Sequence, residues 1–240
     1  MRMNTAIVES VAPVTLVGGG AVYEGDLIEA LALAPVCVAA DGGARHALAA
    51  GVDPTAVVGD FDSIGSDLDR IARSRQIHID EQDSTDFDKA LRHILAPVVL
   101  AVGFTGARFD HQLAALHVLA AYPDRACVLI GESELTFLCP PQIELPLQAG
   151  DVVSLFPMAA VAGASDGLKW EINDLRFDPL AKIGTSNAAL GPVFLTMGAP
   201  AMMVMVPRAR LAAVTQVLKR APQDARWSPR ATQYTRPQQS

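Results

Sequence analysis

The stretch VCVAADGG (residues 36–43) and the stretch AVVGDFDS (residues 56–63) decide the fold of this 240-residue chain. Each begins with a short run of apolar residues and ends abruptly in glycine and aspartate. A short apolar run of this kind is typical of a buried strand, and in an open α/β sheet ligands bind just beyond the carboxyl ends of the strands. The two stretches therefore predict strands with acidic turns at their carboxyl ends.

The same rhythm extends on both sides of these stretches. Strand-like runs at 14–17, 76–79, 98–102 and 126–130 alternate with helical stretches at 26–33, 43–50, 66–75, 85–95 and 110–121. This alternation predicts an α/β fold with a mainly parallel N-terminal sheet and flanking helices. After about residue 132 strand-like segments follow one another without long helices, which favours a C-terminal antiparallel β-domain.

The predicted boundaries are residues 1–135 for the α/β domain, 136–222 for the β-domain and 223–240 for a flexible tail. Composition supports a folded chain, since 50% of the residues are hydrophobic and only 19% are charged. The net charge of −7 argues against a nucleic-acid partner. The most apolar window, residues 193–206, is too short and too broken to span a membrane. Three widely spaced cysteines are expected to be reduced core thiols, so we expect a cytoplasmic protein.

The motif Asp60-Phe61-Asp62 is the sharpest candidate for chemistry. At the end of an extended strand, residues i and i+2 point the same way and lie roughly 6–7 Å apart. Aspartate oxygens are ligands that Mg²⁺ accepts together with substrate phosphates. We therefore expect Asp60 and Asp62 to bind a metal ion, with Phe61 directed into the fold.

Three further turns offer groups for an anionic substrate. In the run from Asp83 to Lys89, Thr85 is expected to cap a helix, Asp86 to bind metal or orient substrate, and Lys89 to meet a phosphate oxygen. In the second turn, Arg108 is expected to clamp phosphate at a helix start, beside Asp110. In the third, Asp41 and Gly42 place a carboxylate beside free backbone amides.

Taken together, these motifs resemble the thiamine pyrophosphokinase family, in order and spacing from about residue 39 to 206. The C-terminal part of the resemblance lies in Gly167-Leu168-Lys169-Trp170 and Gly184-Thr185-Ser186-Asn187. Two positions depart from the family pattern: Ser84, where the family often has lysine, and Ala107, where it often has a second glycine.

The resemblance implies an α/β domain followed by a β-sandwich, and a homodimer with sites between the subunits. It implies Mg²⁺-dependent transfer of pyrophosphate from ATP to the hydroxyl of thiamine. By the same resemblance Asp60, Asp62 and Asp86 hold Mg–ATP, with Asp41, Gly42, Asp83, Thr85, Lys89, Arg108 and Asp110 beside it, and Ser186 and Asn187 help to hold thiamine.

Two other functions fit parts of the sequence. The Asp-x-Asp motif also occurs in other metal-dependent phosphoryl and nucleotide-sugar transferases, including enzymes that form an aspartyl phosphate. A non-catalytic nucleotide or thiamine sensor on the same scaffold is the second alternative. The identity of the general base stays open at this point.

Overall fold

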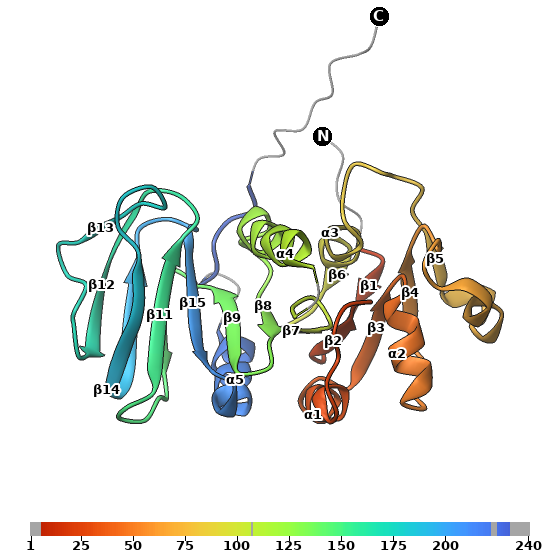
Figure 1. Ribbon diagram of the computed structural model, residues 1–240, viewed down its shortest axis with the longest axis horizontal. Helices are drawn as coiled ribbons and strands as arrows, with labels where there is room; N and C mark the ends of the chain where they lie inside the picture. The colour runs from red at the N-terminus through yellow and green to blue at the C-terminus, as the bar shows by residue number, and fades with distance from the viewer. Residues whose placement is uncertain (1–5, 107, 222–224, 231–240) are drawn as a thin grey trace, which may run out of the picture.

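The protein is described by a computed structural model, which covers residues 6–106, 108–221 and 225–230 (Figure 1). The described residues form the α-helices α1 (Asp26–Leu33), α2 (Gly43–Ala49), α3 (Asp86–Arg92), α4 (Phe109–Ala121) and α5 (Leu211–Arg220). Short 3₁₀ helices lie at Gly65–Arg70, Arg73–Arg75 and Arg208–Arg210. The first nine strands are β1 (Val8–Glu9), β2 (Val14–Val17), β3 (Val36–Ala40), β4 (Ala56–Gly59), β5 (Gln76–His78), β6 (Ile94–Leu95), β7 (Val99–Val102), β8 (Cys127–Ile130) and β9 (Glu134–Leu138). The last six are β10 (Gln142–Leu145), β11 (Val152–Pro157), β12 (Val161–Leu168), β13 (Arg176–Phe177), β14 (Gly184–Met197) and β15 (Met202–Pro207).

One large mixed sheet runs through the molecule in the order β13-β12-β14-β11-β15-β9-β8-β7-β2-β3-β4-β5. The pairings from β5 to β8 are parallel, but β8 pairs antiparallel with β9 and the sheet continues through antiparallel strands. The prediction of a separate, mainly parallel N-terminal sheet is therefore wrong. Only residues 131–133 join β8 to β9, and a parallel crossover needs a dozen or more residues.

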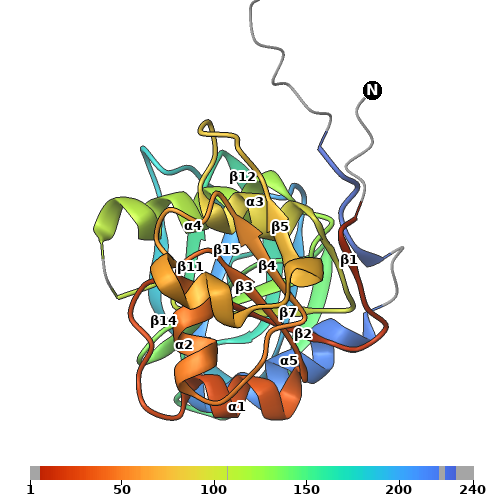
Figure 2. The same ribbon diagram turned by 90° about the vertical axis from the view of Figure 1, so that its right-hand side faces the viewer.

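Helices cover both faces of the parallel strands (Figure 2). Alternate residues of a strand point to opposite faces, so Val17 packs with α1 and α2 while Leu16 packs with α3 and α4. The segment 66–75, predicted as one helix, instead lies in two short 3₁₀ helices, and Gly65, the first residue of the first one, has a φ of +60°. No helix among the described residues is both long and apolar enough to cross a membrane.

The C-terminal strands fold around the long strand β14. Its first residues pair with β11, and its later residues pair with β12 and β10. One buried core includes Leu100 and Val128 of the parallel strands together with Phe137, Val153 and Leu195 of the antiparallel ones. The two parts of the chain are therefore packed through a shared core.

Residues 225–230, which fall within the predicted tail of 223–240, contact the rest of the molecule. The indole Nε1 of Trp227 donates to the carbonyl of Cys139 at 2.8 Å, and the ring packs against both large core clusters. Arg226 donates to the carbonyl of Pro97, and Arg230 donates to the carbonyls of Ala120 and Pro200. Residues 231–240 lie outside the described residues.

We expect Trp227→Ala to lower the free energy of unfolding by about 2 kcal/mol, because it removes a half-buried ring and a hydrogen bond. Urea unfolding followed by circular dichroism measures this loss. The matched control is Trp170→Ala, because Trp170 is 57% exposed and its removal is expected to cost less than about 0.5 kcal/mol. Equal losses in the two variants would show that the docked segment does not stabilise the fold.

Candidate active site

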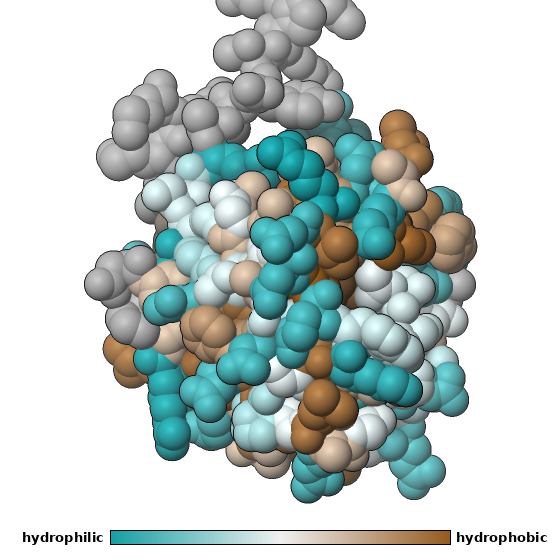
Figure 3. Space-filling model, turned by 90° about the vertical axis from the view of Figure 1, so that its left-hand side faces the viewer, coloured by the Kyte–Doolittle hydropathy of each residue, from teal (hydrophilic) through white to brown (hydrophobic). Residues whose placement is uncertain are grey.

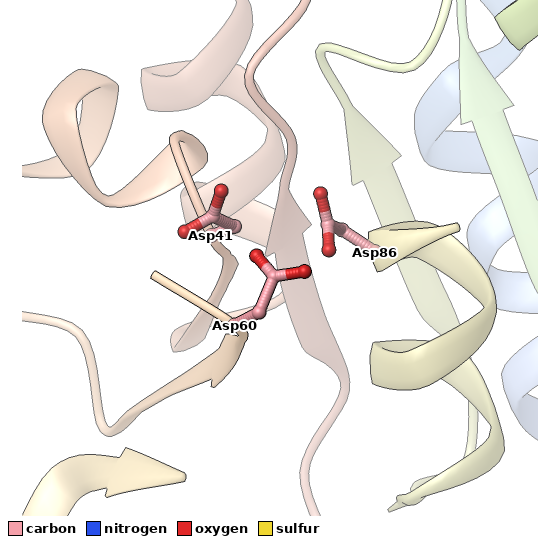
Figure 4. A group of neighbouring side chains, drawn as sticks. All are labelled: Asp41, Asp60 and Asp86. Atoms are coloured by element: carbon pink, nitrogen blue, oxygen red, sulfur yellow. The ribbon is translucent and has the colours of Figure 1, made fainter. Parts of the chain in front are cut away.

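Three aspartates from three separate elements meet at one edge of the sheet (Figure 4). Asp41 follows β3, Asp60 follows β4, and Asp86 is the first residue of α3. One carboxylate oxygen of each lies within 4.8 Å of the others, and the side chains point toward one another. We call this group the acidic cluster. It arises because β3 and β4 are parallel neighbours that end at the same edge.

Asp41 is the buried member of the acidic cluster. Its side chain has no solvent exposure, and its φ of +39° is unusual for a residue other than glycine. Its Oδ2 accepts the backbone N–H of Ser63 at 3.1 Å, whereas its Oδ1 is buried without a hydrogen-bond partner among the described residues. Gly59 allows this close packing, because a Cβ there would lie 2.8 Å from the Cβ of Asp41. Burial, followed by the charge of Asp86, raises the pKa of Asp41 to about 6.

Asp60 is the strongly hydrogen-bonded member. Its Oδ2 accepts from Lys89 Nζ and from Gln82 Nε2, each at 3.0 Å. The hydrogen bond from Lys89 is the main reason that the pKa of Asp60 is lowered. Asp60 therefore carries a full negative charge at neutral pH.

Asp86 is held at the start of α3. Thr85 caps this helix as predicted, since its Oγ1 accepts the backbone N–H of Asp88 at 3.3 Å. Burial raises the pKa of Asp86; Lys89 opposes this shift and the charge of Asp60 adds to it. Like Asp41, Asp86 is thus more easily protonated than an ordinary aspartate.

A divalent cation fits the acidic cluster. An orphaned buried carboxylate oxygen on Asp41 is costly without a partner, and three convergent carboxylates are the hard oxygen donors that Mg²⁺ binds. Two carboxyl groups with raised pKa values also indicate that the negative charge is not fully compensated by the protein.

Asp62 does not belong to the acidic cluster. The prediction that Asp60 and Asp62 point the same way assumed an extended chain, but β4 ends at Gly59 and Phe61 has a φ of +66°. Asp62 is exposed and accepts a hydrogen bond from the Ser63 hydroxyl at 2.7 Å. Phe61 is partly buried against a small core cluster, in line with its predicted direction.

Arg108 and Asp110 also stay outside the cluster. They pair with each other through two hydrogen bonds, Nε to Oδ1 at 3.1 Å and Nη2 to Oδ2 at 2.6 Å, and both side chains are exposed. Asp83 is exposed in the turn that precedes α3, and Gly42 follows Asp41 directly. Ala107 lies outside the described residues.

Ser186 and Asn187 lie on β14, far from the acidic cluster within one chain. Strands β11, β15, β9, β8, β7, β2 and β3 separate β14 from β4 in the sheet. The side-chain amide of the buried Asn187 accepts the backbone N–H of Trp170 at 3.2 Å and donates to the backbone carbonyl of Trp170 at 2.7 Å. Ser186 is exposed with a φ of +61°.

Two contributors to the site escaped the sequence analysis. Gln82 reaches Asp60 through its side chain, and Ser63 reaches Asp41 through its backbone. Ser63 is the last residue of the stretch 56–63 but was given no role, and Gln82 directly precedes Asp83, so proximity to these motifs was the available signal.

Comparisons with known proteins agree with this geometry. Residues 28–130 match the family model for the thiamin pyrophosphokinase catalytic domain, a range that includes Asp41, Asp60 and Asp86. Thiamine pyrophosphokinases 1 and 2 of Arabidopsis thaliana are 34% and 35% identical over 156 and 157 residues. Each match covers 56% of this chain and 58% of the plant protein.

Solved structures share the fold. A thiamin pyrophosphokinase from Geobacillus thermodenitrificans aligns with a TM-score of 0.68 at 21% identity, over 81% of this chain and 97% of that one. The Candida albicans enzyme aligns with a TM-score of 0.69 at 16% identity, over 86% and 95%. The catalytic-domain match and the plant relatives thus show that part of this chain is similar to thiamine pyrophosphokinases, and the solved structures show the same fold.

Proposed function

We propose that this chain transfers pyrophosphate from ATP to the hydroxyl of thiamine, giving thiamine diphosphate and AMP. The observation that carries the proposal is the acidic cluster of Asp41, Asp60 and Asp86, with its orphaned buried oxygen, inside the segment that matches the catalytic domain. In the reaction, the hydroxyl oxygen of thiamine bonds to the β-phosphorus of ATP. The bond from that phosphorus to the oxygen bridging the α-phosphate breaks, and the hydroxyl proton is released.

Asp41, Asp60 and Asp86 would hold Mg²⁺, and Asp62 beside them is proposed as an outer ligand through water. When bound, the ion supplies positive charge to the phosphate oxygens of ATP. Lys89 and Gln82 fix the Asp60 carboxylate in its orientation. Asp86 orients the thiamine hydroxyl or accepts its proton, a role that its raised pKa favours.

The turns around the cluster are proposed to hold the nucleotide. Asp83, Thr85 and Gly42 lie in the turns that flank the three aspartates. Arg108, exposed and paired with Asp110 across its own turn, is proposed to exchange this partner for a phosphate of ATP.

We propose that thiamine binds between two copies of the chain. At least six strands of the sheet separate β14, which carries Ser186 and Asn187, from the strands that carry the acidic cluster, so one copy does not bring them together. The end of the molecule formed by β12 to β14 shows hydrophobic patches among polar ones (Figure 3), and exposed apolar side chains there include Trp170, Leu190 and Phe194. Light scattering should give twice the 25.3 kDa mass of one chain, and a mass of one chain would exclude this arrangement.

We also propose the domain division and the cytosolic location that were predicted from the sequence. Residues 1–135 are proposed as the nucleotide domain and 136–222 as a β-sandwich domain for thiamine binding and dimerisation. The cytosol is supported by Cys37, Cys127 and Cys139, which are all free and buried as predicted.

The direct test follows AMP formation by chromatography while ATP, thiamine and Mg²⁺ are each omitted in turn. AMP and thiamine diphosphate are expected in equal amounts, and only with all three present. ADP in place of AMP, or a covalent phosphate on the protein detected by mass spectrometry, would indicate another phosphoryl transferase. Binding of ATP and thiamine without any AMP would indicate a sensor.

A further inference from the structure

Lys89 occupies the inner side of the acidic cluster. Its side chain is only 2% exposed, and it is one of the largest fully buried side chains among the described residues. Its Nζ lies 3.0 Å from Asp60 Oδ2 and 3.5 Å from Asp86 Oδ1. The sequence suggested that Lys89 meets a phosphate, but its contacts are with carboxylates.

The charge of Lys89 is maintained by the cluster. Burial opposes an ammonium ion, but the hydrogen bond to Asp60 and the charge of Asp86 outweigh this cost, and the pKa of Lys89 is raised. The cluster therefore combines three carboxyl groups with one internal cation.

Two of the three carboxylates have a hydrogen-bond partner other than Lys89. Asp60 is also held by Gln82 at 3.0 Å, and Asp41 by the Ser63 N–H at 3.1 Å. The backbone of Asp86 is held as the first residue of the capped helix α3, and its Oδ1 accepts from Lys89 Nζ at 3.5 Å. The distinct contribution of Lys89 is thus its positive charge.

We propose that Lys89 is an internal counter-cation that weakens the binding of a divalent cation by the acidic cluster until a polyphosphate is present. A cation bound by Asp60 shares this carboxylate with the ammonium group and is repelled by it. The negative charges of a polyphosphate outweigh this repulsion, so cation and polyphosphate enter together. The inference rests on the proposed function, because it takes the cluster to be the Mg–ATP site.

The test is a calorimetric titration of wild type and Lys89→Met with Mn²⁺, without nucleotide and with a non-hydrolysable ATP analogue. Wild type should bind Mn²⁺ weakly alone and much more tightly with the analogue. Lys89→Met, of similar shape but uncharged, should bind Mn²⁺ alone about tenfold tighter or more. Terbium(III) luminescence adds a second readout. If the effect of Lys89→Met is due to charge, the gain in affinity should be larger for a trivalent ion than for Mn²⁺, whereas a change in the shape of the site predicts no such difference.

The matched control is Arg92→Met. Arg92 is a largely buried cation on the same helix, but it pairs with Glu81 and Asp88 outside the cluster. We expect this variant to lose stability while its Mn²⁺ affinity changes less than about twofold. An equal gain in Mn²⁺ affinity in both variants would show that the effect does not depend on the contacts of Lys89 with the acidic cluster.

Unchanged or weaker Mn²⁺ binding by Lys89→Met would overturn the proposal. If that variant does not fold, the titrations of wild type still test the proposal. Mn²⁺ binding by wild type that is equally tight with and without the analogue would also overturn the proposal. Such a result alongside normal AMP formation would leave the proposed function intact. Absence of AMP formation, with no Mn²⁺ bound even beside the analogue, would instead reject the proposed function.

Discussion

Replacing Asp86 by Asn is expected to lower the rate of AMP formation by about 10³-fold at saturating ATP and thiamine. The variant loses a carboxylate that faces Asp41 and Asp60, and with it a ligand for the cation and a group that can orient the thiamine hydroxyl. The fold should survive, since Asn has the same size and relieves a carboxylate whose pKa is raised mainly by burial. AMP is measured by chromatography, and folding by thermal melting with circular dichroism.

Two matched variants make this result specific. Asp62→Asn, exposed and outside the acidic cluster, should lose less activity than Asp86→Asn. Asp67→Asn removes a carboxylate that pairs with Arg70 on the surface and should leave the rate unchanged. Near-normal AMP formation by Asp86→Asn would remove Asp86 from the chemistry, and equal losses for Asp62 and Asp86 would place Asp62 among the direct ligands.

The sequence was a good guide where local pattern and packing agree. The parallel strands β2, β4, β7 and β8 are short, fully buried and mostly apolar, and the Thr85 cap depends only on residues one turn apart. The segment 66–75 was harder, because its helical spacing of apolar residues did not reveal that the chain after Gly65 closes into 3₁₀ turns. The mixed sheet follows from a three-residue connection between β8 and β9, a length that is visible in the sequence once the strand ends are known.

The site was predictable to the extent that it depends on strand ends. Asp60 and Asp86 were expected together, and they are. Asp41 was placed beside them but proves to be a full member, whereas Asp62, which follows the left-handed Phe61, is exposed and is not one of the three. A positive φ at a residue other than glycine has no reliable sequence signal. The burial of Lys89 likewise results from packing between α3 and the strands, which spacing alone does not reveal.

Asp41→Asn is expected to stabilise the metal-free protein at pH 8 by about 2–3 kcal/mol while abolishing most activity. The pKa of Asp41 rises from the ordinary value of 3.8 to about 6, chiefly through burial. Because the pKa of Asp41 is higher in the folded protein than in the unfolded chain, ionisation of Asp41 above pH 6 destabilises the folded protein. That cost shrinks as the pH falls, and below the unfolded pKa both states are protonated. The gain from Asn should therefore fall to about 0.5 kcal/mol at pH 4.

Asn suits this position in other respects, so the variant isolates the charge. It tolerates the φ of +39°, and its carbonyl oxygen can still accept the Ser63 N–H. Urea unfolding in the presence of a chelator, at pH 8 and pH 4, measures the difference from wild type, with the exposed Asp62→Asn as the control. Adding Mg²⁺ with the ATP analogue should stabilise wild type more than Asp41→Asn, since only wild type has the complete acidic cluster. Two results would contradict this prediction: a difference in the free energy of unfolding that does not depend on pH, or a variant that is less stable than wild type at pH 8. Either would mean that the ionised carboxylate of Asp41 does not destabilise the metal-free protein.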